Sequence, residues 1–229
     1  MSKTDIYIVL PSAGSGLRLG SKTPKPFIPI HGKPLFVWTI QAFKKKMQAK
    51  EIILAIDMNL EARYIQALRR YRLQNIRLVP GGALRADSVF KAVNAIEGLS
   101  GIVMIHDVAR PLLDEEPIVD LIKMAVKRGA ALLAEKASAT VKQVKRGSMV
   151  VEQTLDREQI YLAQTPQAFQ LSVLRNAYKL QKNKISAFTD EASIVEACGK
   201  KVVIVPGTSL NFKITTKADL KLARKLLKK

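Results

Sequence analysis

The first residues suited to chemistry lie in a glycine-rich stretch near the amino terminus. Residues 10–27 read LPSAGSGLRLGSKTPKPF, so an apolar run leads into three glycines, Arg18 and Lys25. Glycines let a backbone approach a ligand closely and turn its N–H groups toward an anion. Arg18 offers a planar fork for phosphate oxygens, and Lys25, between two prolines, offers a point charge. The stretch predicts a phosphate-binding loop whose two cations suit a phosphoryl transition state.

Two familiar phosphate loops do not fit this stretch. A Walker A loop needs a second glycine five positions after the first, where this sequence has Leu19 or Ser21. A dinucleotide-binding loop needs the pattern G-x-G-x-x-G, and Leu19 again stands where the third glycine should be. The loop therefore belongs to neither class, and a glycine-rich turn without a ligand is the structural alternative.

Composition indicates a folded protein with a large excess of positive charge. Hydrophobic residues make up 48% of the 229 residues, which is enough for the core of one large domain. The 38 basic and 19 acidic residues give a formal net charge of +19, which raises the hypothesis of a nucleic-acid partner. The lysines, however, cluster on predicted helix faces without interleaved aromatic residues. We therefore favour solvated helix faces and expect no nucleic-acid partner.

The sequence also bounds the cellular setting. It has no apolar run of ~18 residues that could span a bilayer, and residues 5–11 are too short for the core of a signal peptide. Cys198 is the single cysteine, so it can form neither an internal disulfide nor a thiolate metal site. We expect a cytoplasmic protein with no membrane partner.

The order of apolar and amphipathic segments predicts an α/β fold. Apolar runs typical of buried strands occur at residues 6–10, 52–56, 76–79, 102–105, 130–134 and 202–205. Helical stretches occur at residues 34–48, 60–72, 86–97, 115–128, 171–182, 190–198 and 217–228. We expect a three-layer, mostly parallel, Rossmann-like twisted sheet with helices on both faces. Because such sheets bind ligands outside the carboxyl ends of their strands, chemistry is expected in the residues just after each strand.

Residues 136–164 interrupt this alternation. Within them, SATVKQVKRGSMVVEQTL has the pattern of two short strands around a turn at Arg146, Gly147 and Ser148. An isolated hairpin is marginally stable in water, so we expect this protruding β-hairpin arm to pack against a second subunit. The domain prediction is a single domain over residues 1–229, with 136–164 as a dimerisation arm.

Several motifs together carry a resemblance to a known family. The segments SAGSGLRLG and TPKPF are similar to the signature of sugar-phosphate nucleotidyltransferases. Five further segments occur in the order seen in the 2-C-methyl-D-erythritol 4-phosphate cytidylyltransferases: GGALRADSV (81–89), HDVARP (106–111), TPQAF (165–169), TDEAS (189–193) and NFKIT (211–215). The resemblance covers the chain from about residue 6 to residue 226.

The resemblance implies a reaction as well as a fold. Members of this family transfer CMP from CTP to the phosphate of a sugar-alcohol phosphate and release diphosphate, with Mg²⁺ held largely by the triphosphate. The step belongs to the non-mevalonate route to isoprenoid precursors. Because a phosphate monoester is largely dianionic at neutral pH, no general base is required. This agrees with a chain whose two histidines, His31 and His106, suit a surface turn and a structural position.

The resemblance also implies roles for individual positions. Four cations would stabilise the transition state or hold the attacking phosphate: Arg18, Lys25, Arg157 and Lys213. The nucleotide would bind at Ser12, Ala13, Gly14, Ser15, Gly16, Gly81, Gly82, Arg85 and Ser88. The acceptor would bind at Asp107, Arg110, Thr140, Thr165 and Thr189. In the family the arm crosses to the partner, so each active site would be shared across a homodimer.

The sequence alone leaves the roles of some residues open. Asp107 has three alternatives, namely ribose or substrate hydroxyls, the metal, or a local ion pair with Arg110, which is itself a candidate for the substrate phosphate. Ser12 stands where family members usually have alanine, and Val108 replaces a small residue.

Three rival functions are weighed against this one. The nearest is a ribitol 5-phosphate cytidylyltransferase, whose members tend to have a second glycine in place of Ala13. A glycosyltransferase would carry a D-x-D motif, which this sequence lacks. The rival of another class is a basic RNA-binding protein, which would leave Arg18 and Lys25 unexplained.

Overall fold

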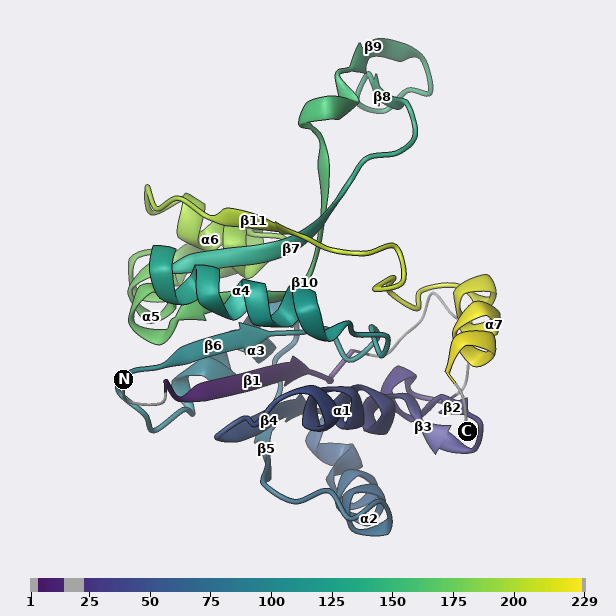
Figure 1. The fold of residues 1–229 in the computed structure, drawn as a ribbon, viewed down its shortest axis with the longest axis vertical. Helices are drawn as coiled ribbons and strands as arrows, with labels where there is room; N and C mark the ends of the chain where they lie inside the picture. The colour runs from purple at the N-terminus through teal and green to yellow at the C-terminus, as the bar shows by residue number, and fades with distance from the viewer. Residues whose placement is uncertain (1–3, 15–22, 228–229) are drawn as a thin grey trace.

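The computed structural model describes residues 4–14 and 23–227 of the chain. Its centre is a seven-stranded twisted sheet in the order β11-β7-β10-β6-β1-β4-β5 (Figure 1). The strands are β1 (Ile6–Pro11), β4 (Glu51–Ile56), β5 (Ile76–Pro80), β6 (Ile102–Ile105), β7 (Ala130–Lys136), β10 (Tyr161–Gln170) and β11 (Val203–Pro206). All neighbours pair in parallel except β10, which is antiparallel to both β6 and β7. The expected mostly parallel α/β sheet is confirmed.

Helices cover both faces of the sheet. They are α1 (Leu35–Lys46), α2 (Glu61–Arg70), α3 (Arg85–Asn94), α4 (Glu115–Arg128), α5 (Leu171–Leu180), α6 (Glu191–Glu196) and α7 (Lys217–Leu226). Alternate residues of β1 point to opposite faces: Val9 joins the core under α3, α5 and α6, whereas Leu10 joins the core under α1, α2 and α4. Burial on both faces explains why the inner strands β1, β4 and β6 are near-continuous apolar runs. No helix within the described ranges is long and apolar enough to cross a bilayer.

Short elements fill the connections. A small hairpin of β2 (Pro29–Ile30) and β3 (Lys33–Pro34) turns at His31 and Gly32, whose φ angles of 49° and 76° suit a tight hairpin turn. The predicted surface position of His31 is confirmed, since its side chain is exposed. The described residues also form short 3₁₀ helices, namely η2 (Lys25–Phe27), η3 (Met58–Leu60), η4 (Arg157–Gln159) and η5 (Lys182–Ala187).

Strand β10 is the one strand of the central sheet that the local sequence pattern does not predict. Its sequence YLAQTPQAFQ has no apolar run, because Gln164, Thr165 and Gln167 are polar and Pro166 stands in the middle. Proline is normally confined to sheet edges or bulges, since it lacks an N–H for the ladder. Here the register between β10 and β7 shifts between Ala163 and Gln167, so a bulge accommodates the proline in a central strand. The buried polar residues have hydrogen-bond partners described below.

The predicted hairpin is present and stands apart from the sheet. Strands β8 (Val141–Val144) and β9 (Val151–Leu155) form a two-stranded sheet at the far end of a long projection (Figure 1). Gly147, with a φ of 75°, lies in the turn between them. The predicted range 136–164 is slightly too wide, because Tyr161 pairs with Lys136 and Ala163 with Ala134 as continuations of β10 and β7. We call residues 137–160 the arm.

Candidate functional site

A cleft of about 430 Å³ opens at the carboxyl ends of β1, β5 and β6. Residues that directly follow these strands line it, as expected for a parallel sheet. The lining residues are Pro11, Ser12, Ala13, Gly14, Lys25, Pro26, Gly82, Ala83, Leu84, Arg85, Ser88, Asp107, Val108, Ala109, Lys213 and Thr215. Nine of the predicted site residues are in this set. The predicted Ser15, Gly16 and Arg18 lie outside the described residues.

The start of the glycine loop is fixed from below by Tyr64 of α2. The Ser12 hydroxyl lies 2.7 Å from Tyr64 Oη, and Tyr64 Oη donates to the Ser12 carbonyl oxygen at 3.0 Å. Since a phenol has a single proton, the Ser12 hydroxyl must donate to Tyr64 Oη. The hydroxyl that replaces the family's usual alanine is therefore satisfied inside the protein. Burial raises the pKa of Tyr64 far above its usual value, so the phenol remains a donor at neutral pH.

Tyr64 also contacts the segment that carries Lys25. Lys25 is the first residue of η2, and Phe27 is its last. The Phe27 ring packs edge-on against Tyr64, with 4.6 Å between ring centroids, and Phe36 of α1 packs against both rings. One buried side chain thus holds two separate segments of the cleft wall together.

The two glycines after β5 allow two chain segments to meet closely. A methyl group on Gly81 would lie 2.5 Å from the Ala13 Cβ, and one on Gly82 would lie 2.2 Å from the Asp87 Cβ. Ser88 accepts a hydrogen bond from the Gly82 N–H at 2.9 Å, which closes the turn into α3. The predicted close approach at these glycines is therefore observed between two segments of the protein itself, rather than between the backbone and a ligand. It brings the turn after β5 against the glycine loop.

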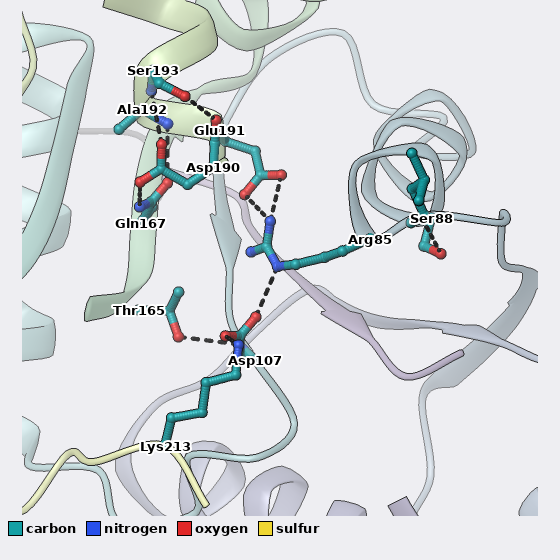
Figure 2. Close-up of polar contacts among 11 residues, drawn as sticks. Arg85, Ser88, Asp107, Thr165, Gln167, Asp190, Glu191, Ala192, Ser193 and Lys213 are labelled. Atoms are coloured by element: carbon teal, nitrogen blue, oxygen red, sulfur yellow. Dashed lines mark hydrogen bonds and ion pairs between the residues drawn. The ribbon is translucent and has the colours of Figure 1, made fainter. Parts of the chain in front are cut away.

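Four charged side chains form a network at one side of the cleft (Figure 2). Arg85, Asp107 and Lys213 line the cleft, whereas the fourth, Glu191, does not. Arg85 Nε donates to Asp107 Oδ1 at 2.9 Å, and Arg85 Nη1 contacts both carboxylate oxygens of Glu191 at 2.9 and 3.0 Å. Lys213 Nζ donates to the other oxygen of Asp107 at 2.6 Å. The alternative of a local Asp107–Arg110 ion pair is wrong, because among the described residues Asp107 pairs with Arg85 and Lys213.

The network fixes the charges of its members. Burial alone would raise the pKa of Asp107, but the positive charges of Arg85 and Lys213 outweigh it and hold that pKa well below its usual value. Burial disfavours the charged form of Arg85, but the Glu191 and Asp107 carboxylates outweigh this and raise its pKa. Burial raises the pKa of the Glu191 carboxyl, and Arg85 offsets part of that effect. Asp107 and Arg85 are therefore ionised at neutral pH.

His106 and Thr165 support the backbone of Asp107 from beneath. His106 Nε2 lies 2.9 Å from the carbonyl oxygen of Arg110, which can only accept, so Nε2 carries the proton. The Thr165 hydroxyl then donates to His106 Nδ1 at 3.1 Å and accepts from the Asp107 N–H at 3.1 Å. Burial lowers the pKa of His106 to about 4, so the ring is neutral at pH 7 and both of its nitrogens are engaged. This arrangement agrees with the predicted structural position of His106.

Four other predicted residues lie away from the cleft lining. Arg110 Nη1 donates to the Asn211 carbonyl oxygen, beside the segment that carries Lys213. Thr189 is exposed just before α6. Thr140 and Arg157 belong to the arm; Thr140 is exposed, and Arg157 Nη1 donates to the Ser138 carbonyl oxygen at 2.9 Å. The described chain does not bring these two to its own cleft.

Sequence reasoning missed two residues that shape the site, Glu191 and Tyr64. Glu191 stands inside the quoted TDEAS segment, yet its position next to a candidate threonine does not reveal that it is buried. Tyr64 lies in a helix whose other residues are mostly exposed. The one available signal for Tyr64 is that its side chain is the single aromatic one in that helix.

The described residues contain no group of three histidine, cysteine, aspartate or glutamate side chains that could hold a metal ion. Asp107, the candidate ligand from the sequence, contacts cations with both of its carboxylate oxygens.

Comparison with known proteins agrees with the geometry. The sequence model of a family described as 2-C-methyl-D-erythritol 4-phosphate cytidylyltransferase matches residues 6–229. The chain belongs to this family. It is accordingly a nucleotidyltransferase that transfers a cytidylyl group to 2-C-methyl-D-erythritol 4-phosphate. The predicted family and activity are both confirmed.

Individual relatives in the cytidylyltransferase family match over nearly their full length. The protein of that name from Bacillus mycoides is 36% identical over 221 residues, covering 96% of each chain. The one from Bacillus cereus is 37% identical over 224 residues, covering 96% of this chain and 97% of its own.

Solved structures of the cytidylyltransferase family agree as well. The 4-diphosphocytidyl-2C-methyl-D-erythritol synthase of Anaerococcus prevotii has a TM-score of 0.84 at 30% identity and covers 99% of both chains. The 2-C-methyl-D-erythritol 4-phosphate cytidylyltransferase of Francisella tularensis has a TM-score of 0.82 at 33% identity, covering 98% of this chain and 100% of its own.

Proposed function

We propose that the cleft binds CTP and transfers its cytidylyl group to 2-C-methyl-D-erythritol 4-phosphate in the formation of isoprenoid precursors. The observation that carries the proposal is that one cleft contains the start of the glycine loop, Lys25, Arg85, Asp107 and Lys213. These residues come from five separate segments of the chain. Family membership names the reaction, and the cleft offers the cations that such a reaction needs.

The donor half of the cleft suits CTP. Lys25 and the backbone of Ser12–Gly14 would hold the phosphates, together with Arg18 of the same loop. The turn from Gly81 to Ser88 would contact the cytosine with fixed backbone groups. Tyr64 holds Ser12 and the segment of Lys25 together, and Ala13 lies against the turn at Gly81, so this described part of the donor half is formed before the ligand arrives.

The acceptor half centres on Lys213. An ammonium group has three N–H donors, and Asp107 uses one of them, so two can contact the acceptor phosphate. An oxygen of that phosphate attacks the α-phosphorus of CTP and forms a new P–O bond. The bond from the α-phosphorus to the bridging oxygen breaks, and diphosphate leaves with the electron pair. Positioning two anions in line would supply much of the acceleration.

Mg²⁺ is proposed to enter as the counterion of CTP. Magnesium in phosphate sites is usually bound by the substrate's own phosphates and few protein groups. Asp107 would assist such a complex indirectly, because its two carboxylate oxygens hold Arg85 and Lys213 in place beside the cleft. This proposal adds no protein-held metal to the mechanism.

A homodimer is proposed to complete the acceptor half. Thr140 and Arg157 are exposed on the arm, and the arm tip also exposes Met149 and Val150 to 91% and 71%. Exposed apolar residues on a projecting hairpin favour contact with another chain. If two chains exchange arms, each arm can bring Thr140 and Arg157 to the partner's cleft.

The test is release of diphosphate from CTP with Mg²⁺, with 2-C-methyl-D-erythritol 4-phosphate and ribitol 5-phosphate offered in parallel. We expect release with the first acceptor and formation of 4-diphosphocytidyl-2-C-methyl-D-erythritol. Lys25→Ala should abolish it, which controls for a contaminating enzyme. Release with ribitol 5-phosphate alone would keep the chemistry and reassign the acceptor. RNA binding without CTP turnover would overturn the proposal.

A further inference from the structure

Glu191 is a buried carboxylate without a role in the mechanism above. Its side chain is only 1% exposed, at the first position of α6. Burying an ionised carboxylate costs several kcal/mol unless a partner compensates for it. The partner is Arg85, whose Nη1 lies 2.9 and 3.0 Å from the two carboxylate oxygens. Glu191 is not among the residues that line the cleft.

The position of Glu191 is fixed by the central sheet. Gln167 of β10 donates to Asp190 Oδ2 at 2.7 Å and accepts from the Ala192 N–H at 3.0 Å. Asp190 in turn caps α6 by accepting from the Ser193 N–H at 3.0 Å. The residues on either side of Glu191 are therefore bound to a buried strand (Figure 2). The backbone that carries Glu191 therefore cannot shift to follow a movement of the Arg85 side chain.

The Glu191 carboxylate determines which nitrogen of Arg85 contacts Asp107. With Nη1 held by Glu191, Arg85 contacts Asp107 through Nε at one oxygen, and the second oxygen holds Lys213. A guanidinium without such a restraint prefers to bind a carboxylate through two parallel hydrogen bonds. That arrangement would place a second cation on the oxygen that now holds Lys213, in competition with it.

We propose that Glu191 is a positioning residue that acts through Arg85 and Asp107 to aim Lys213 into the cleft. The inference rests on the proposed function, because its effect is read through transfer to the acceptor. Glu191 touches no substrate in this account. It restrains Arg85 so that the guanidinium contacts one oxygen of Asp107. The other oxygen then binds Lys213 and holds its ammonium group toward the cleft.

The experiment is a double-mutant cycle on the full-length protein with Glu191→Gln and Lys213→Met. We measure single-turnover rates of cytidylyl transfer with saturating CTP and enzyme in excess, so that slow variants remain measurable. Glu191→Gln keeps the shape and removes the charge. We expect it to lower kcat/KM for the acceptor by about tenfold and to change the KM for CTP by less than about threefold.

The decisive result is the coupling between the two positions. If Glu191 acts through Lys213, the double variant should be within about twofold of Lys213→Met alone. Losses that multiply would overturn the proposal, because a merely structural effect of Glu191 would be independent of Lys213. A normal acceptor rate in Glu191→Gln would overturn it directly. The matched control is Glu196→Gln, an exposed glutamate at the other end of α6, which should behave like the unmodified protein.

A second variant covers the case in which Glu191→Gln does not fold. Replacing a buried ion pair with apolar residues of similar volume is often neutral for stability. Arg85→Met with Glu191→Met should therefore fold, and combined with Lys213→Met it should transfer CMP at a rate within about twofold of Lys213→Met alone. Losses that multiply in this triple variant would overturn the proposal. If the unmodified protein transfers nothing to the acceptor, both the proposed function and this inference are wrong. If the unmodified protein and Glu191→Gln transfer at the same rate, only this inference is wrong.

Discussion

In the cleft, Lys213 lies 2.6 Å from Asp107 and has an ordered place within one chain, whereas Arg157 on the arm has a side chain that is 53% exposed. Both are basic residues proposed to grip the same phosphate. Lys213 is oriented by Asp107, which is in turn held by Arg85, Thr165 and the buried His106. Arg157 is tied to the carbonyl oxygen of Ser138 and to the neighbouring Glu158.

The difference shows how one active site can be assembled at two levels. The cleft obtains its order from the sheet, because buried charges keep their geometry only when every partner is in place. The arm obtains its order within the hairpin and leaves its functional side chains exposed to solvent. It follows that changes in the cleft should act within one chain, while changes in the arm should act on a neighbouring chain.

The largest expected effect is that of Lys213→Met. Removing one positively charged group from a phosphoryl transition state should lower kcat by about 10²–10³-fold. Steady-state kinetics with varied acceptor would measure it, with circular dichroism as the check on folding. A loss confined to the KM for CTP would contradict the assignment of Lys213 to the acceptor half.

Mixing subunits distinguishes the cleft from the arm. Arg157→Met and Lys213→Met should each be inactive, but a dissociated and reassociated equal mixture should regain about a quarter of normal activity. Half of the randomly formed dimers would be mixed, and each of these would hold one intact site. Activity assays on the mixture and on the separate variants check this outcome.

The matched control for the mixture pairs two residues of the same cleft. Lys25 and Lys213 both line it, so Lys25→Ala mixed with Lys213→Met should regain nothing. Recovery in this control, or none with Arg157→Met, would contradict a site that is shared between chains.

A smaller effect is expected on the stability of the protein at acidic pH, and it comes from the buried His106 beneath Asp107. Because burial lowers the pKa of His106 to about 4, the unfolded chain binds a proton between that value and ~6.5 while the folded chain does not. This contribution to the free energy of unfolding is fully present above pH ~6.5. It falls by up to about 3 kcal/mol as the pH drops toward 4.

The substitution His106→Gln should remove that contribution. Urea unfolding at several pH values between 7.5 and 4.5 would then show a shallower loss of stability with acid than in the unmodified protein. If the free energy of unfolding falls equally with acid in both proteins, His106 does not stay neutral in the folded protein.

The smallest effect is expected from Ser12→Ala. It removes the hydroxyl that donates to Tyr64 but keeps the bond from Tyr64 to the Ser12 carbonyl oxygen, so we expect a loss of about 1 kcal/mol in stability. The KM for CTP should change by less than about twofold. Tyr64→Phe, which frees that carbonyl, should raise the KM for CTP more than Ser12→Ala does. Equal KM values in both variants would show that Tyr64 does not hold the glycine loop.

Much of the fold could be predicted from local pattern. The six apolar runs all became strands. A strand in the interior of a sheet that helices cover on both faces is apolar at nearly every position, so its sequence alone reveals it. The turn at Gly147 was equally local. Strand β10 could not be found this way, since its buried Gln164 and Gln167 are tolerated only because Thr208 and Asp190 satisfy them from distant segments. Burial of a polar residue depends on partners that a local pattern does not contain.

The candidate site divides in the same manner. Residue types and spacing by themselves determined the glycine loop, its nearby lysine and the motif order that matches the family. Only the tertiary structure decided that Arg85 contacts Asp107 and Glu191, that Lys213 shares Asp107, and that Thr140 and Arg157 stay away from their own cleft. Arg85 and Glu191 are separated by 106 positions, and so are Asp107 and Lys213. Spacing along a chain specifies a turn or a loop, whereas the topology of the sheet specifies which strand ends meet and therefore which charges pair.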